Sequence, residues 1–139
     1  MQPIVWDTSI YISKMRSGLI WDLADNDRVT LSSVVAAELI TGFVNKPKGL
    51  LSFDLFVKSM TERNRIITPS HNDWYLTGII IGKILATRPD LKNKRSLLFN
   101  DCLICTSGKK INAKVVTSNI KDFELIRQYI NFNVSYQTC

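Results

Sequence analysis

Short runs of β-branched residues alternate with amphipathic stretches along this chain of 139 residues. Such alternation is typical of an α/β fold, in which helices connect the strands of a parallel sheet. We interpret residues 4–6, 28–32, 65–68 and 114–117 as strands and place Val134 in a last edge strand. The sequence therefore predicts a three-layer α/β/α sandwich around a mostly parallel sheet of four or five strands.

Helices are expected between these strands, because apolar residues recur there at helical spacing. The first begins after Asp7-Thr8-Ser9, and the others are expected at residues 34–43, 50–62, 69–86, 97–109 and 122–128. Either Ser32 or Ser33 is a suitable N-cap for the second helix. Residues 46–49 are expected to break the chain, and residues 87–96 to form a polar, basic loop.

The size and composition of the chain favour one soluble domain spanning residues 1–139. A hydrophobic content of 45% is sufficient for a core, and no internal repeat is visible. An odd number of cysteines, three, and an N-terminus without a signal-peptide pattern favour a reducing compartment. The longest apolar stretch, residues 76–86, is too short to cross a membrane. We therefore expect a cytoplasmic protein with no membrane segment.

The chain is basic, with 18 lysines and arginines against 12 acidic residues and a net charge of +6. A basic surplus favours polyanionic partners such as nucleic acids, but a small protein also needs net charge for solubility. The densest basic cluster contains Lys92, Lys94 and Arg95. It is either a solvated loop or a surface that contacts the RNA backbone.

Polar residues follow two of the expected strands directly. Asp7 ends the first strand, and Thr117, Ser118 and Asn119 end the fourth. Ligands of parallel sheets bind outside the carboxyl ends of the strands, so both clusters are expected at one edge of the sheet. Each also has a structural interpretation: Asp7 can cap a helix, and Asn119 with Asp122 makes a good helix start.

Two further acidic residues lie in apolar surroundings. Glu38 has small or apolar neighbours one helical turn away, and a half-buried carboxylate requires a cation or a hydrogen-bond donor. Asp101 falls inside an expected helix, where aspartate is a weak helix former. The alternatives are an exposed helix face for Glu38 and a favourable helix dipole for Asp101. Because Mg²⁺ and Mn²⁺ prefer oxygen ligands, the acids together fit metal-assisted phosphodiester hydrolysis.

Four segments resemble, in order and spacing, the four motifs of PIN domains, and the resemblance covers nearly the whole chain. The segments are residues 4–9 (IVWDTS), 33–39 (SVVAAEL), 100–104 (NDCLI) and 115–123 (VVTSNIKDF). The similarity is closest to the VapC-type toxins of bacterial toxin–antitoxin pairs. It implies a metal-dependent endoribonuclease, a cognate antitoxin and a homodimer.

The resemblance also implies roles for individual residues. Asp7, Glu38 and Asp101 would be the catalytic, metal-binding acids for Mg²⁺ or Mn²⁺. Residues expected to support the site are Thr8, Thr117, Ser118 and Asp122.

Many PIN domains place a fourth acid where Asn119 stands. Asn119 can bind a metal through its carbonyl group but brings no charge, so we expect one tight metal site. The departure also favours an alternative, a non-catalytic PIN-like module that binds RNA or protein.

One further motif is interpreted as structural. Cys102 and Cys105 form a C-x-x-C inside an apolar helical run, whereas a zinc site would need two more ligands from His71 and Cys139. We therefore expect buried core cysteines and no catalytic role for His71.

Overall fold

A parallel five-stranded sheet organises the chain in the computed structural model, which describes residues 1–16 and 28–138. The strands are β1 (Ile4–Trp6), β2 (Val29–Ser32), β3 (Ile66–Ile67), β4 (Lys114–Thr117) and β5 (Asn133–Tyr136). Their order is β3-β2-β1-β4-β5, and every neighbouring pair is parallel. The predicted sheet is confirmed, at the upper limit of the expected strand number.

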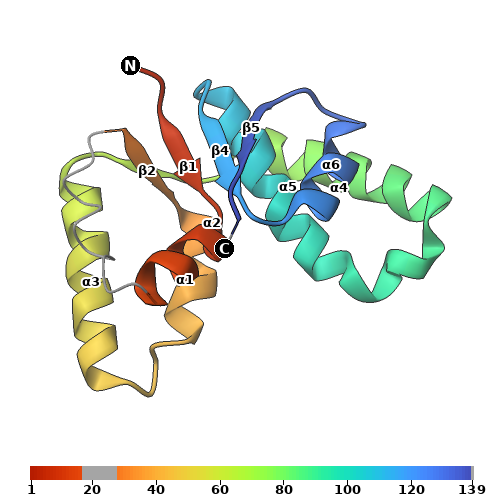
Figure 1. The fold of residues 1–139 in the computed structure, drawn as a ribbon. Helices are drawn as coiled ribbons and strands as arrows, with labels where there is room; N and C mark the ends of the chain where they lie inside the picture. The colour runs from red at the N-terminus through yellow and green to blue at the C-terminus, as the bar shows by residue number, and fades with distance from the viewer. Residues whose placement is uncertain (17–27, 139) are drawn as a thin grey trace.

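Helices cover both sides of this sheet. They are α1 (Thr8–Arg16), α2 (Ser33–Thr41), α3 (Pro47–Glu62), α4 (His71–Thr87), the 3₁₀ helix η2 (Pro89–Lys94), α5 (Arg95–Lys110) and α6 (Ile120–Arg127). Figure 1 shows α1 and α3 on one side of the strands and α4, α5 and α6 on the other. The three-layer α/β/α architecture is thus the one predicted. No helix of the described residues is long and apolar enough to cross a membrane.

The strand order reverses direction next to β1. The chain first moves outward from β1 to β2 and β3, and then returns to place β4 on the other side of β1. The carboxyl ends of β1 and β4 therefore flank the topological switch point, where open α/β sheets bind their ligands. The backbone N–H of Asp7 donates to the carbonyl of Val116 at 2.9 Å and ties these two strand ends together.

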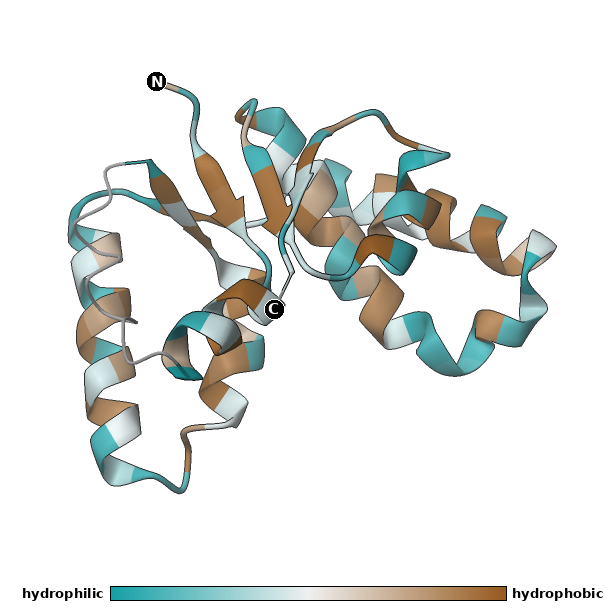
Figure 2. Cartoon of the chain, in the orientation of Figure 1, coloured by the Kyte–Doolittle hydropathy of each residue, from teal (hydrophilic) through white to brown (hydrophobic). Residues whose placement is uncertain are grey.

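The core fills the space between the sheet and the helices. Val5, Leu31 and Val115 from the strands are fully buried, as are Leu98 and Ile104 of α5. Figure 2 shows how strongly hydrophobic residues concentrate on β1, β2 and β4. Each such side chain stabilises the fold by about 1.5–3 kcal/mol relative to an exposed one. The strands that carry the switch point are consequently held rigidly.

Several boundaries differ from those predicted. α3 begins at Pro47, inside the expected chain break, because proline is well suited to the first turn of a helix. The expected loop at residues 87–96 contains η2, and α5 begins at Arg95. α6 begins at Ile120 because Asn119 is its N-cap. Turns and caps of this kind are set by local contacts that apolar periodicity does not report.

The C-x-x-C motif is part of the core, as predicted. Cys102 and Cys105 are free and fully buried on α5. Burial raises the pKa of Cys102 to about 11 and that of Cys105 well above its ordinary value. Thiols held protonated in this way are poor nucleophiles and metal ligands. Cys139, the third cysteine, lies outside the described residues.

Candidate active site

Asp7 lies at the switch point, between the end of β1 and the start of α1. The residue is 5% exposed. One oxygen, Oδ2, accepts hydrogen bonds from Thr117 Oγ1 at 2.8 Å and from Ser9 Oγ at 3.0 Å. These donors come from β4 and α1, so two elements distant in sequence fix the orientation of one carboxylate. The Ser9 hydroxyl in turn accepts from the backbone N–H of Ser118 at 3.2 Å.

Glu38 approaches the same place from α2. Its Oε1 accepts a hydrogen bond of 2.9 Å from Thr8 Oγ1, the residue directly after Asp7. The Glu38 side chain is half-buried, and burial raises the pKa of its carboxyl. Hydrogen bonds from Thr8 and Asn100 act against that rise, whereas the charge of Asp7 adds to it. Glu38 and Asp7 are therefore near enough to repel each other.

Asp101 completes the acidic group from α5. Its side chain is 9% exposed. Burial, followed by the charges of Asp7, Asp122 and Glu38, raises the pKa of Asp101 to about 8, although the Lys94 ammonium acts in the opposite direction. The acids that the sequence singled out thus act on one another from four segments: the end of β1, α2, α5 and, with Asp122, α6.

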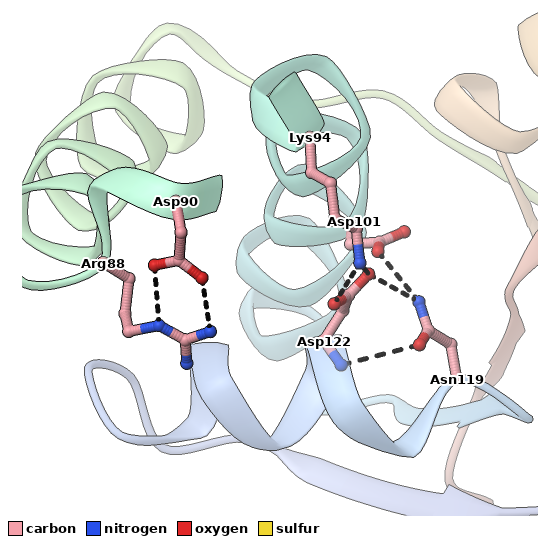
Figure 3. Close-up of polar contacts among 6 residues, drawn as sticks. All are labelled: Arg88, Asp90, Lys94, Asp101, Asn119 and Asp122. Atoms are coloured by element: carbon pink, nitrogen blue, oxygen red, sulfur yellow. Dashed lines mark hydrogen bonds and ion pairs between the residues drawn. The ribbon is translucent and has the colours of Figure 1, made fainter. Parts of the chain in front are cut away.

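Asn119 and Asp122 form the other side of this acidic group, at the start of α6 (Figure 3). Asn119 Nδ2 donates to Asp122 Oδ2 at 3.0 Å and lies 3.4 Å from Asp101 Oδ2. Asn119 Oδ1 instead accepts from the backbone N–H of Asp122 at 3.5 Å, which is the predicted capping role. The carbonyl oxygen faces the helix and the amide nitrogen faces the acids, so metal binding by Asn119 stays a prediction.

Lys94 has a position that the sequence did not indicate. Its Nζ donates to both oxygens of Asp122, at 2.9 and 3.1 Å, and Figure 3 shows it reaching from the start of α5 to the start of α6. The expected basic cluster is therefore divided: Lys94 is engaged inside the acidic group, whereas Lys92 and Arg95 are exposed. RNA contact by Lys92 and Arg95 stays a prediction, and for Lys94 the ion pair is the observed role.

The donor set suits a hard divalent cation. Asp7, Glu38 and Asp101 offer carboxylate oxygens, which Mg²⁺ and Mn²⁺ prefer, and their mutual repulsion would be relieved by a positive ion. Within residues 1–16 and 28–138, no group of three or more histidine, cysteine, aspartate or glutamate side chains already stands in an arrangement that could hold a metal. The fit of these residues to a divalent cation therefore rests on the chemistry of their oxygen atoms and on the closeness of the three acids.

An apolar hollow adjoins the acids. It has a volume of about 450 Å³, and Glu38 and Asn100 form part of its wall. Most of the remaining lining is apolar, from Val34, Trp74 and Leu103. Trp74 is 52% exposed, an unusual degree for so large an apolar side chain. The hollow thus offers an apolar surface directly beside a carboxylate.

No family model and no curated protein matches the sequence. Among solved structures, the fold is similar to that of VapBC2 from Rickettsia felis, solved bound to a DNA fragment from its promoter. That match has a TM-score of 0.61 and 23% identity and covers 99% of this chain and 100% of the other. DNA-bound VapBC from Salmonella typhimurium gives a TM-score of 0.58 at 19% identity, covering 98% of each chain. VapBC-1 from nontypeable Haemophilus influenzae gives a TM-score of 0.56 at 22% identity, covering 97% of this chain and 98% of the other. The predicted resemblance to VapC-type PIN domains is thereby confirmed at the level of the fold.

Proposed function

We propose that this protein is a metal-dependent endoribonuclease in which Asp7, Glu38 and Asp101 hold Mg²⁺ or Mn²⁺. The proposal is supported by the closeness of these three acids, from the end of β1, from α2 and from α5, since the charges of Asp7 and Glu38 both act on Asp101. Repulsion among them contributes to a pKa of about 8 for Asp101. A cluster of acids that disfavour one another's charge is suited to binding a cation.

The chain's own residues would prepare the site for hydrolysis of a phosphodiester bond. Thr117 and Ser9 orient Asp7, and Thr8 orients Glu38, so hydroxyl groups hold two of the three acids in place. When bound, the metal would lower the pKa of a water molecule and offset the charge that develops on the phosphate. We expect the products to carry 5′-phosphate and 3′-hydroxyl ends.

The surface near the site supports RNA as the substrate. The net charge of +6 favours a polyanion, and Lys92 and Arg95 are exposed at the η2–α5 junction, next to Lys94 of the acidic group. Phosphate contacts by such residues would supply affinity without sequence preference. The RNA is expected to be single-stranded or looped.

We propose in addition that the protein is the toxin of a toxin–antitoxin pair and that its antitoxin binds beside the acids. Three solved structures with this fold are VapBC complexes, and the apolar hollow beside Glu38 is suited to a hydrophobic segment of a partner. Such a segment would block access to the acids without altering them. A homodimer is part of the same proposal.

A nuclease assay with matched variants tests the proposal. Wild-type protein should cleave single-stranded RNA with Mg²⁺ or Mn²⁺ and should lose this activity when a chelator is added. D7N and D101N should be inactive while remaining folded. D54N, which removes an exposed acid from α3, is the matched control and should cleave like the wild type.

Two outcomes would contradict the proposal. The first is cleavage that a chelator does not affect, and the second is full activity of D101N with Mn²⁺. Binding of RNA without any cleavage under either metal would instead favour the non-catalytic PIN-like module.

A further inference from the structure

Asp122 differs from the other acids of the site in its partners. Both of its oxygens accept from Lys94 Nζ, at 2.9 and 3.1 Å, and Oδ2 also accepts from Asn119 Nδ2 at 3.0 Å. Asp122 lies in the first turn of α6, where the helix dipole favours a negative charge. Its side chain is only 6% exposed. A carboxylate with this many donors has little capacity left to bind a divalent ion.

Lys94 is placed to act on the whole acidic group. It is the last residue of η2, and its side chain, 38% exposed, spans to α6 beside Asp101. An ion pair joins the side chains of Lys94 and Asp122, which are 28 positions apart in the sequence, so the contact depends on the packing of α5 against both η2 and α6. An ammonium in this position brings a positive charge next to the acids.

We propose that Lys94 is the built-in cation of the site, which withdraws Asp122 from metal binding and limits the site to one divalent ion held by Asp7, Glu38 and Asp101. The part concerning the bound ion rests on the proposed function. Lys94 is a positioning residue in this proposal, since it acts through Asp122 and through the charge balance of the group.

The charges of the group explain why one ion suffices. One ammonium and one divalent ion together leave a single negative charge on the four carboxylates. A second divalent ion would make the group positive and would lie close to the ammonium, which repels it. A second ion would also need a charged ligand at the start of α6, where Asn119 is neutral and Asp122 is already bound. Removal of the ammonium should therefore release Asp122 as a ligand.

The competing explanation is that Lys94 only clamps η2 to α6. A clamp would contribute to stability, but it would not change how many metal ions bind. The two roles are separated by counting ions, with Mn²⁺ as the probe, in the full-length protein. The variants are K94M, which keeps the length of the side chain without its charge, K94R, D122N and the double variant K94M/D122N.

Calorimetric titration with Mn²⁺ should give one site in the wild type and in K94R. K94M should gain a second site, or bind in its second step at least about tenfold more tightly, and K94M/D122N should lose that gain. Without metal, K94M should melt about 3–6 °C below the wild type, and Mn²⁺ should raise its melting temperature more than that of the wild type. K83M, which removes an exposed lysine from α4, is the matched control and should leave the titration unchanged.

The inference is overturned if K94M binds no more Mn²⁺ than the wild type, or if the gain persists in K94M/D122N. A count of two ions in K94R would also contradict it, because that variant retains the positive charge. A gain that depends on Asp122 supports the role of Lys94 even if the wild type proves unable to cleave RNA. In that event the proposed function fails by the nuclease assay, separately from the assignment of Lys94.

Discussion

Asp101 and Asp122 lie on consecutive helices at the same edge of the sheet, and both are almost fully buried, but their surroundings differ. Asp122 accepts from an ammonium and from an amide within 3.1 Å. Asp101 lies 3.4 Å from the same amide and close to the charges of Asp7, Asp122 and Glu38, which together with burial raise its pKa to about 8.

The comparison divides the acidic group into a satisfied half and an unsatisfied half. The satisfied half, Lys94, Asn119 and Asp122, has its charges paired by the chain itself. The unsatisfied half, Asp7, Glu38 and Asp101, accepts its recorded hydrogen bonds from neutral hydroxyl and amide groups, and the charge of Asp7 helps to raise the pKa of both Glu38 and Asp101. A buried carboxylate paired with an ammonium has its charge balanced, whereas one held by neutral donors keeps a charge that a bound cation could balance.

The largest effect is expected in the unsatisfied half. D101N should reduce RNA cleavage by about 10²–10³-fold, as is typical when one electrostatic group of an active site is removed. The same change relieves repulsion, so the melting temperature of the metal-free protein should rise. A cleavage rate with Mn²⁺, compared with a thermal melt in chelator, measures both. Lower stability together with normal cleavage would reverse the assignment of the two halves.

The matched change in the satisfied half should act on stability instead. D122N removes one partner of a buried ion pair, a change that typically costs about 3–5 kcal/mol. Because the Lys94 side chain is 38% exposed and can be rehydrated, we expect a loss of about 1–3 kcal/mol in the free energy of unfolding. Chemical denaturation of D122N beside D101N checks this, and opposite signs for the two variants are the expected result.

The pH dependence of stability should also separate the halves. The pKa of Asp101 rises from its ordinary 3.8 to about 8 on folding, so the folded protein binds more protons than the unfolded chain between these values. The free energy of unfolding of the metal-free protein should therefore decrease as the pH rises through that window. D101N should flatten the decrease, and saturating Mn²⁺ should do the same. An identical pH profile in D101N would show that other groups are responsible.

The smallest effect is expected outside both halves, at the exposed basic residues. K92M/R95M should weaken RNA binding and reduce the slope of log K against log salt by about one to two, because each phosphate contact on a single strand contributes about 0.7. K94M should leave that slope nearly unchanged, since in the wild type the Lys94 ammonium is already paired with Asp122. Filter binding at several salt concentrations compares them, and a larger change in K94M would place the RNA path across the acidic group.

Much of the fold could be predicted because its signals are local. The strands β1 and β4 have the predicted bounds, since short β-branched runs between polar residues are read directly from the sequence. Helix ends were harder to predict. The start of α5 at Arg95 follows a 3₁₀ helix whose polar, basic residues resemble a loop.

The sequence by itself also determined which chemical groups the site contains. Asp7 and Thr117 each follow a strand, and parallel strands bring their carboxyl ends to one edge, so the meeting of these residues follows from the chain pattern alone. The resemblance to PIN domains assigned Glu38 and Asp101 to the same group.

Only the tertiary structure decided which acids are paired. Lys94 appeared in the sequence as one of several basic residues of a surface loop, and no local signal connects it with Asp122. The ion pair exists because η2, α5 and α6 pack together and carry an ammonium to a carboxylate that is distant in the chain. Charge pairing depends on distances of a few ångströms between side chains of different elements, and such distances are fixed by packing rather than by the pattern of residues.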